Sequence, residues 1–89
     1  MLILEQDKEI ILNFDNVSAI TVDSALDGKN IVAVCNNGDG VKLGTYETSE
    51  RAKEVLQEII KSYREYRTAE CDGYTDVLEE TAVFEMPQK

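Results

Sequence analysis

The chain has 89 residues, of which 43% are hydrophobic and 30% are charged. This length supports one domain around one hydrophobic core, and the composition is that of a folded globular protein rather than a disordered chain. Eighteen Asp and Glu residues against nine Lys and Arg residues give a formal charge of −9, which disfavours binding to nucleic acid through phosphate contacts.

The chain shows no pattern of a membrane or secreted protein. No apolar run approaches the roughly 18 to 20 residues that a membrane helix needs. Residues 1–5 lack the basic region and the long apolar region of a signal peptide. We therefore expect a cytoplasmic protein that has no membrane partner.

Short apolar runs separated by turn residues predict hairpins in the first half of the chain. Residues 2–6 and 9–14 form the first expected hairpin. Residues 17–24 alternate in polarity, with Ile20 and Val22 on one face, and this period of two predicts a half-exposed strand.

Two Gly-containing turns predict a second and a third hairpin. Asp27 and Gly28 precede an apolar strand at residues 31–35, and the Asn-Asn-Gly-Asp-Gly run at 36–40 leads into a strand at 41–46. The second run resembles part of a calcium loop, but its oxygens do not have the alternating spacing and no Glu closes it. The pattern favours a hairpin over a metal site.

The strongest pattern in the sequence is an amphipathic helix over about residues 49–66. Thr48 is suited to cap it, because its hydroxyl can accept a backbone N–H of the first turn. Apolar residues recur at helical spacing and predict one buried stripe. These residues are Ala52, Val55, Leu56, Ile59, Ile60 and Tyr63.

The rest of the chain predicts a mobile acidic loop at residues 68–80 and a last strand at 81–86, which Pro87 ends. We expect this strand to pair beside the amino-terminal strand and to cover its edge. The predicted fold is α+β: a single domain over residues 1–89, with a five- to six-stranded, mainly antiparallel sheet packed by one helix.

Several residue patterns that carry enzyme chemistry are missing. The sequence has no histidine, which removes the usual general base and the usual metal ligand. It contains no Gly-rich phosphate-binding motif. Cys35 lies in an apolar run and is expected to be a small buried apolar residue. Glu70 and Asp72 should disfavour the thiolate of Cys71, because their charges are negative. We expect neither an enzyme nor a bound cofactor.

The strand at residues 31–35 predicts self-association, because it is apolar on both faces while one helix can cover only one. The uncovered face holds either Ile31, Ala33 and Cys35, or Val32 and Val34. A twofold contact between two copies is the commonest way to shield such a face. The alternative is that the loop from residue 68 folds over that face instead. We therefore expect a homo-oligomer, with a dimer favoured.

Three segments carry a family resemblance: residues 43–56 (LGTYETSERAKEVL), 15–17 (DNV) and 84–87 (FEMP). In these segments the chain resembles small uncharacterised proteins of Firmicutes and their phages. The resemblance implies a bacterial or prophage-encoded cytoplasmic protein with the same strand, cap, helix and strand order. The resemblance implies no activity and no site residues.

The sequence thus favours a noncatalytic interaction module that associates with itself. The alternative is an acidic phage-type inhibitor that mimics nucleic acid or covers a basic host protein, which the charge of −9 suggests. That alternative requires the acidic side chains to form one continuous stripe.

Overall fold

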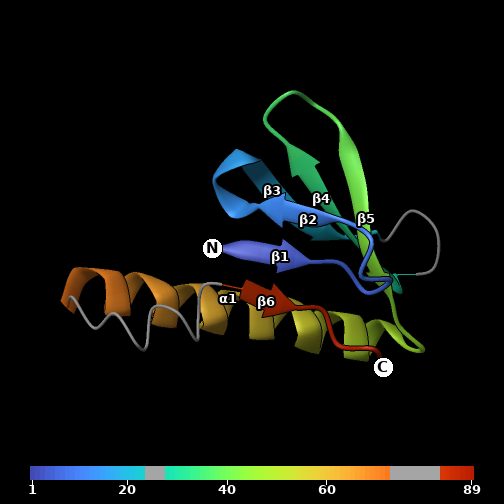
Figure 1. Ribbon diagram of the computed structural model, residues 1–89. Helices are drawn as coiled ribbons and strands as arrows, with labels where there is room; N and C mark the ends of the chain where they lie inside the picture. Colours follow the sequence, from blue (N-terminus) through green and yellow to red (C-terminus); the bar gives the residue numbers. More distant parts are fainter. Residues whose placement is uncertain (24–27, 73–82) are drawn as a thin grey trace.

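The computed structural model describes residues 1–23, 28–72 and 83–89, without the side chains of residues 68–72. Within these ranges the protein is α+β, with the helix α1 (Ser49–Asp72) lying beneath two three-stranded sheets (Figure 1). The strands are β1 (Leu2–Leu4), β2 (Ile11–Asn13), β3 (Val17–Val22), β4 (Asn30–Cys35), β5 (Gly40–Thr45) and β6 (Val83–Glu85).

The expected single sheet is divided into two. The first sheet has the order β2-β1-β6 and the second has the order β3-β4-β5. A 3-10 turn, η1 (Phe14–Asn16), separates β2 from β3, and the side-chain oxygen of Asn13 accepts the N–H of Asp15 at 3.0 Å. Because this turn redirects the chain after only three paired residues of β2, β3 begins a second sheet.

The pairing of the last strand beside the first one is confirmed. β6 runs parallel to β1, with Ile3 opposite Phe84, while all the other strand pairs are antiparallel. β6 thereby covers one edge of β1, and β2 covers the other edge. The N–H of Gln6, just after β1, donates to the carbonyl oxygen of Leu43 at 2.8 Å and links the first sheet to β5.

The helix starts where the sequence predicts and ends later. The Thr48 hydroxyl oxygen accepts the N–H of Arg51 at 3.1 Å, which confirms the cap. The predicted end near residue 66 is wrong, because residues 68–72 continue α1. Residues 49–72 contain no Gly or Pro, and the first glycine after the helix start is Gly73, so nothing in the backbone chemistry stops the helix earlier. The rest of the predicted loop, residues 73–80, lies outside the described part of the chain.

The turn at residues 36–40 forms the hairpin that the sequence favoured. Gly38 has a φ of 92°, which a residue with a Cβ rarely adopts. The side-chain oxygen of Asn37 accepts the N–H of Asp39 at 3.0 Å. The N–H of Cys35 donates to the carbonyl oxygen of Asp39 at 2.8 Å and closes the hairpin.

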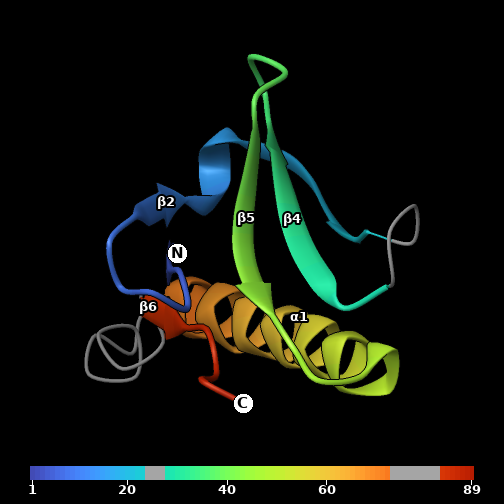
Figure 2. The same cartoon turned by 90° about the vertical axis from the view of Figure 1, so that its right-hand side faces the viewer.

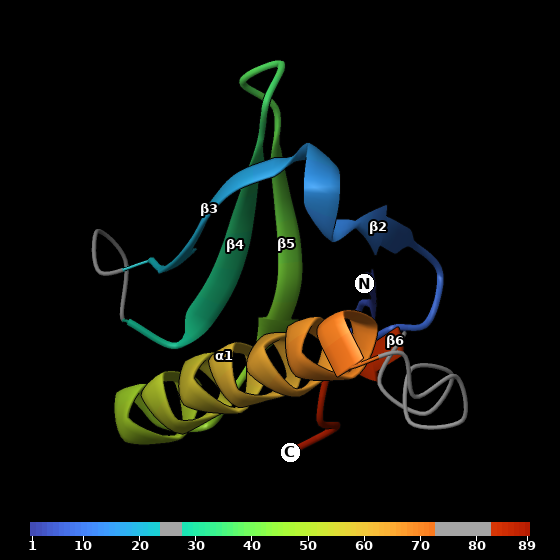
Figure 3. The ribbon, with the colours of Figure 1, turned by 90° about the vertical axis from the view of Figure 1, so that its left-hand side faces the viewer.

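The hydrophobic core lies between α1 and the inner faces of both sheets. Figures 2 and 3 show α1 crossing beneath one end of the β4–β5 hairpin, while the hairpin tip extends away from it. Val55 and Ile59 are buried and each contributes roughly 1.5 to 3 kcal/mol. The other buried apolar residues are Met1, Ile3, Ile31, Ala33, Leu43, Tyr46, Ala52 and Met86.

Candidate interaction surfaces

The strand predicted to self-associate, β4, is covered on one face by the helix. Ile31 and Ala33 are fully buried and belong to the core cluster with Val55. The face with Ile31, Ala33 and Cys35 therefore cannot dock a partner, because α1 already packs against it. Cys35 itself is half-buried and is not part of a disulfide.

The other predicted face of β4 is partly exposed, and its neighbours are small or polar. Val32 and Val34 are half-buried. Val32 lies opposite Thr21 on β3 and opposite Lys42 on β5. Val34 lies opposite Ala19 on β3 and opposite a glycine on β5. This face offers only two valines to a partner and is a weak apolar surface.

A broader apolar surface lies on the first sheet, where the sequence did not predict one. Leu2 is 38% exposed, Ile11 is 61% exposed and Val83 is 45% exposed. Leu2 lies opposite Val83, and Leu4 lies opposite Ile11. Directly opposed residues have Cβ atoms about 4.5 to 5.5 Å apart, so these four side chains form one patch. We call this patch, Leu2, Leu4, Ile11 and Val83, the β1 face.

The signal for the β1 face was present in the sequence but incomplete. Leu2 and Leu4 are two residues apart, so they share one face of a strand while Ile3 takes the other. Ile3 is fully buried. Only the pairing of β1 with both β2 and β6 shows that Ile11 and Val83 join the two leucines.

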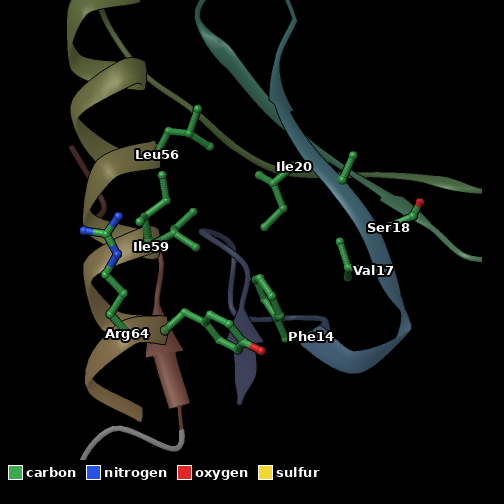
Figure 4. A pocket seen from close by; sticks show the side chains of 10 residues that line it. Phe14, Val17, Ser18, Ile20, Leu56, Ile59 and Arg64 are labelled. Atoms are coloured by element: carbon green, nitrogen blue, oxygen red, sulfur yellow. The ribbon is translucent and has the colours of Figure 1, made fainter. Parts of the chain in front are cut away.

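The second apolar surface is a groove of about 410 Å³ between α1 and β3 (Figure 4). We call it the α1–β3 groove. Its apolar lining consists chiefly of Phe14, Val17, Ile20, Leu56, Ile60 and Tyr63. The rings of Phe14 and Tyr63 stack with their centroids 4.6 Å apart. In Figure 4 Leu56, Ile20 and Phe14 face the space between helix and strand, and Arg64 lies along the helix at its rim.

Among the described residues, the titratable side chain with a shifted pKa is Tyr46, which belongs to the core beside the carboxyl-terminal segment. Burial raises the pKa of Tyr46 from 10.0 to about 12; the guanidinium of Arg51 opposes this shift, and Glu58 adds to it. The Tyr46 hydroxyl donates to the carbonyl oxygen of Pro87 at 2.9 Å. Because the phenol is a hydrogen-bond donor in the interior, its role is structural.

The described residues show neither a metal-binding cluster nor a helix that could span a membrane. Among them, no three His, Cys, Asp or Glu side chains come together as a metal-binding group. In the same part of the chain, α1 lacks the length of uninterrupted apolar sequence needed to cross a bilayer.

Comparison of the chain with protein family models, with curated proteins and with solved structures finds no match.

Proposed function

We propose that this protein is a noncatalytic interaction module that self-associates through the β1 face. The proposal rests on one observation: Leu2, Ile11 and Val83 are exposed on the same surface patch. They are three of the large exposed apolar side chains among the described residues. Single exposed apolar residues are ordinary on a protein surface, whereas a contiguous patch favours a docking site.

A second copy is the partner that this surface favours. A twofold contact brings the same patch from both copies together, so each apolar side chain finds apolar partners without any other protein. The patch lies on strands of three residues, and its small size predicts a weak dimer, because stable interfaces bury about 800 Å² on each side.

The charge of the chain predicts how salt changes this association. Each copy has a formal charge of −9, and Glu85 lies opposite Leu4 at the border of the β1 face. Charge repulsion therefore opposes the dimer, and added salt should strengthen association by screening that repulsion. A dimer held mainly by ion pairs would show the opposite dependence.

Sedimentation of two single variants tests the proposal. Ile11→Thr keeps a β-branched residue in β2 but removes apolar area, at a cost of about 1 kcal/mol in each of two copies, so the dissociation constant should rise about ten- to a hundredfold. Ile60→Gln is the control, because Ile60 is 39% exposed but lies in the α1–β3 groove. A monomeric wild-type protein at high micromolar concentration would remove the dimer proposal.

The resemblance to small proteins of Firmicutes and their phages is compatible with a module of this kind, and we retain a bacterial or prophage origin as part of the proposal. The acidic inhibitor finds less support. Arg51 forms ion pairs with Glu54 at 3.2 Å and with Glu58 at 3.7 Å, so bases interrupt the acidic residues along α1. We do not propose it as the function.

A further inference from the structure

The α1–β3 groove runs along the edge of a sheet. Its lining includes the four consecutive residues 17–20 of β3. Successive side chains of a regular strand point to opposite faces, and the register shift between Val17 and Ala19 interrupts this alternation. Four consecutive residues of β3 therefore line the groove where it follows the edge of the strand. β3 is the outer strand of the order β3-β4-β5, and its backbone pairs with β4 on one side only.

This edge has backbone groups available for pairing. The register with β4 is regular from Ala19 to Val22, after a shift between Val17 and Ala19. On the side of residues 19–22 away from β4, no backbone hydrogen bond is formed within the described residues. An open edge of this kind accepts an extended peptide as an additional strand.

One flank of α1 carries basic residues and no acidic residue, whereas the other flank carries both. At 3.6 residues per turn, Lys53, Ile60, Arg64 and Arg67 fall within an arc of about 60°, and Ile60 and Arg64 line the groove. This arc has no acidic residue. The opposite flank holds four glutamates, Glu50, Glu54, Glu58 and Glu65, with Arg51 and Lys61 among them.

The basic flank is therefore a local exception in an acidic protein. Neither Lys53 nor Arg64 has an ion-pair partner among the described residues. At physiological ionic strength charges are screened beyond roughly 8 Å, so a ligand in the groove responds to Arg64 at the rim more than to the net charge of −9. The groove thus has an apolar floor, an open strand edge and a basic rim.

We propose that the α1–β3 groove binds an extended acidic segment of a partner protein, which adds as a strand to the edge of β3. Alternate side chains of such a strand point the same way about 7 Å apart, and apolar ones enter the groove among Leu56, Ile60 and Tyr63. Acidic side chains face Lys53 and Arg64. The volume of about 410 Å³ lies within the range of about 300 to 1,000 Å³ found for binding pockets.

The groove and the β1 face share no residue, so the two proposals can fail separately. The peptide experiment is performed on the Ile11→Thr protein as well as on the wild type. Peptide binding in both proteins supports the groove whatever the oligomeric state. Loss of peptide binding in Ile11→Thr alone would mean that the peptide binds at or through the β1 face and would overturn the groove proposal.

The probe is a synthetic peptide in which isoleucine or valine alternates with glutamate, titrated into labelled protein and followed by amide NMR shifts. We expect the largest shifts at residues 17–22 of β3 and along the Lys53 and Arg64 flank of α1. A matched peptide with lysine in place of glutamate should bind about tenfold more weakly, because it places like charges against that flank. A third peptide, N-methylated along one edge, should lose binding because it cannot pair with β3.

Three charge variants complete the experiment. Arg64→Glu should weaken binding of the glutamate peptide by about tenfold, and Arg64→Gln by a smaller factor, because it removes the attraction without reversing it. Arg64 is exposed, so both variants should keep the wild-type fold, which their amide spectra outside the groove report. Glu65→Gln, on the acidic flank, should leave binding within about twofold of wild type.

Three further results would overturn the proposal. Equal binding of the glutamate and lysine peptides would remove the charge selection, and undiminished binding of the N-methylated peptide would remove strand addition. Binding to vesicles of phosphatidylglycerol without binding to the glutamate peptide would assign the basic flank to an anionic lipid surface instead.

Discussion

The side-chain amide of Gln6 pairs with the backbone of Thr45 as the peptide group of a neighbouring strand would. Its oxygen accepts the N–H of Thr45 at 2.9 Å, and its nitrogen donates to the carbonyl oxygen of Thr45 at 3.1 Å. The same nitrogen lies 3.1 Å from the carbonyl oxygens of Pro87 and Gln88. One half-buried amide thus joins β5 to the segment after β1 and to the segment after β6.

Replacing Gln6 should loosen this junction. Gln6→Ala removes the partner of the exposed backbone groups of Thr45 and should reduce the free energy of unfolding by about 0.5 to 1.5 kcal/mol. Gln6→Glu should also destabilise, because a carboxylate can still accept the N–H of Thr45 but cannot donate to the three carbonyl oxygens. Urea unfolding measures both changes.

The matched control for these variants is Gln57→Ala. Gln57 is exposed on α1, and its replacement should stay within about 0.5 kcal/mol of wild type. If Gln6→Ala were as harmless as Gln57→Ala, the amide bridge would contribute nothing to stability.

Gly44 is required by the ring of Tyr46. A Cβ at position 44 would lie 3.1 Å from the Tyr46 hydroxyl oxygen and 3.2 Å from its Cε2 atom. The ring cannot move away easily, because it is buried and its hydroxyl bonds to Pro87. Gly44→Ala should therefore reduce the free energy of unfolding by about 1 to 3 kcal/mol through overpacking.

Gly40→Ala provides the comparison, because both glycines lie in β5. A Cβ at position 40 would meet its nearest neighbour, the Cγ1 atom of Val32, at 3.7 Å, which is an ordinary contact. Thermal unfolding should show little change for this variant. Equal destabilisation by the two alanines would attribute the effect to the strand rather than to the Tyr46 ring.

The raised pKa of Tyr46 predicts a loss of stability at alkaline pH. Unfolding exposes the phenol and returns its pKa from about 12 to 10.0, so between these values the unfolded chain releases a proton that the folded protein keeps. The stabilisation is complete below pH 10 and is lost as the pH rises towards 12, by at most about 2 to 3 kcal/mol.

Tyr46→Phe isolates this effect from the titration of lysines and of the other tyrosines. The variant loses the hydrogen bond to Pro87 and should be less stable than wild type below pH 10, and the difference should shrink between pH 10 and 12. Urea midpoints across this range measure it. A constant difference would show that the folded protein does not hold the phenol neutral.

Ile59 and Ile60 are adjacent in α1, and replacing each one tests which side of the helix packs against the sheets. Ile59 is 2% exposed and Ile60 is 39% exposed. Ile59→Ala should cost about 2 to 5 kcal/mol, because it leaves a cavity between the helix and the sheets. Ile60→Ala removes the same atoms from a partly exposed position and should cost clearly less. Similar losses would mean that the helix does not dock on the side that contains Val55 and Ile59.

The helix and the hairpins were predictable because their signals are local. Thr48 caps α1 as its position predicts, and Gly38 closes the β4–β5 hairpin. A hydrogen-bonding hydroxyl beside free N–H groups and a glycine in a tight turn act over a few residues. The predicted end of α1 near residue 66 was wrong, because the helix continues to Asp72 and no Gly or Pro interrupts residues 49–72.

The candidate surfaces were less predictable, because they depend on contacts between distant segments. Ile31 and Val32 are both apolar and adjacent in β4, and only the docking of α1 buries the first while leaving the second half-exposed. Ile11 and Leu4 become neighbours only through the pairing of β1 with β2. Residues 47–67 hold five acidic and five basic residues, and only the tertiary structure shows that the flank with Arg64 borders the α1–β3 groove.

The sequence by itself determined the α+β order, the starting point of the helix, the apolar stripe around Val55 and the acidic charge, because each follows from composition or from a spacing of a few residues. Only the tertiary structure decided that the strands divide into two sheets, that the β1 face is exposed and that β3 leaves an open edge beside α1. These features depend on contacts between segments that are far apart in the chain. Which apolar side chains become buried in such contacts is decided by the packing of the whole domain.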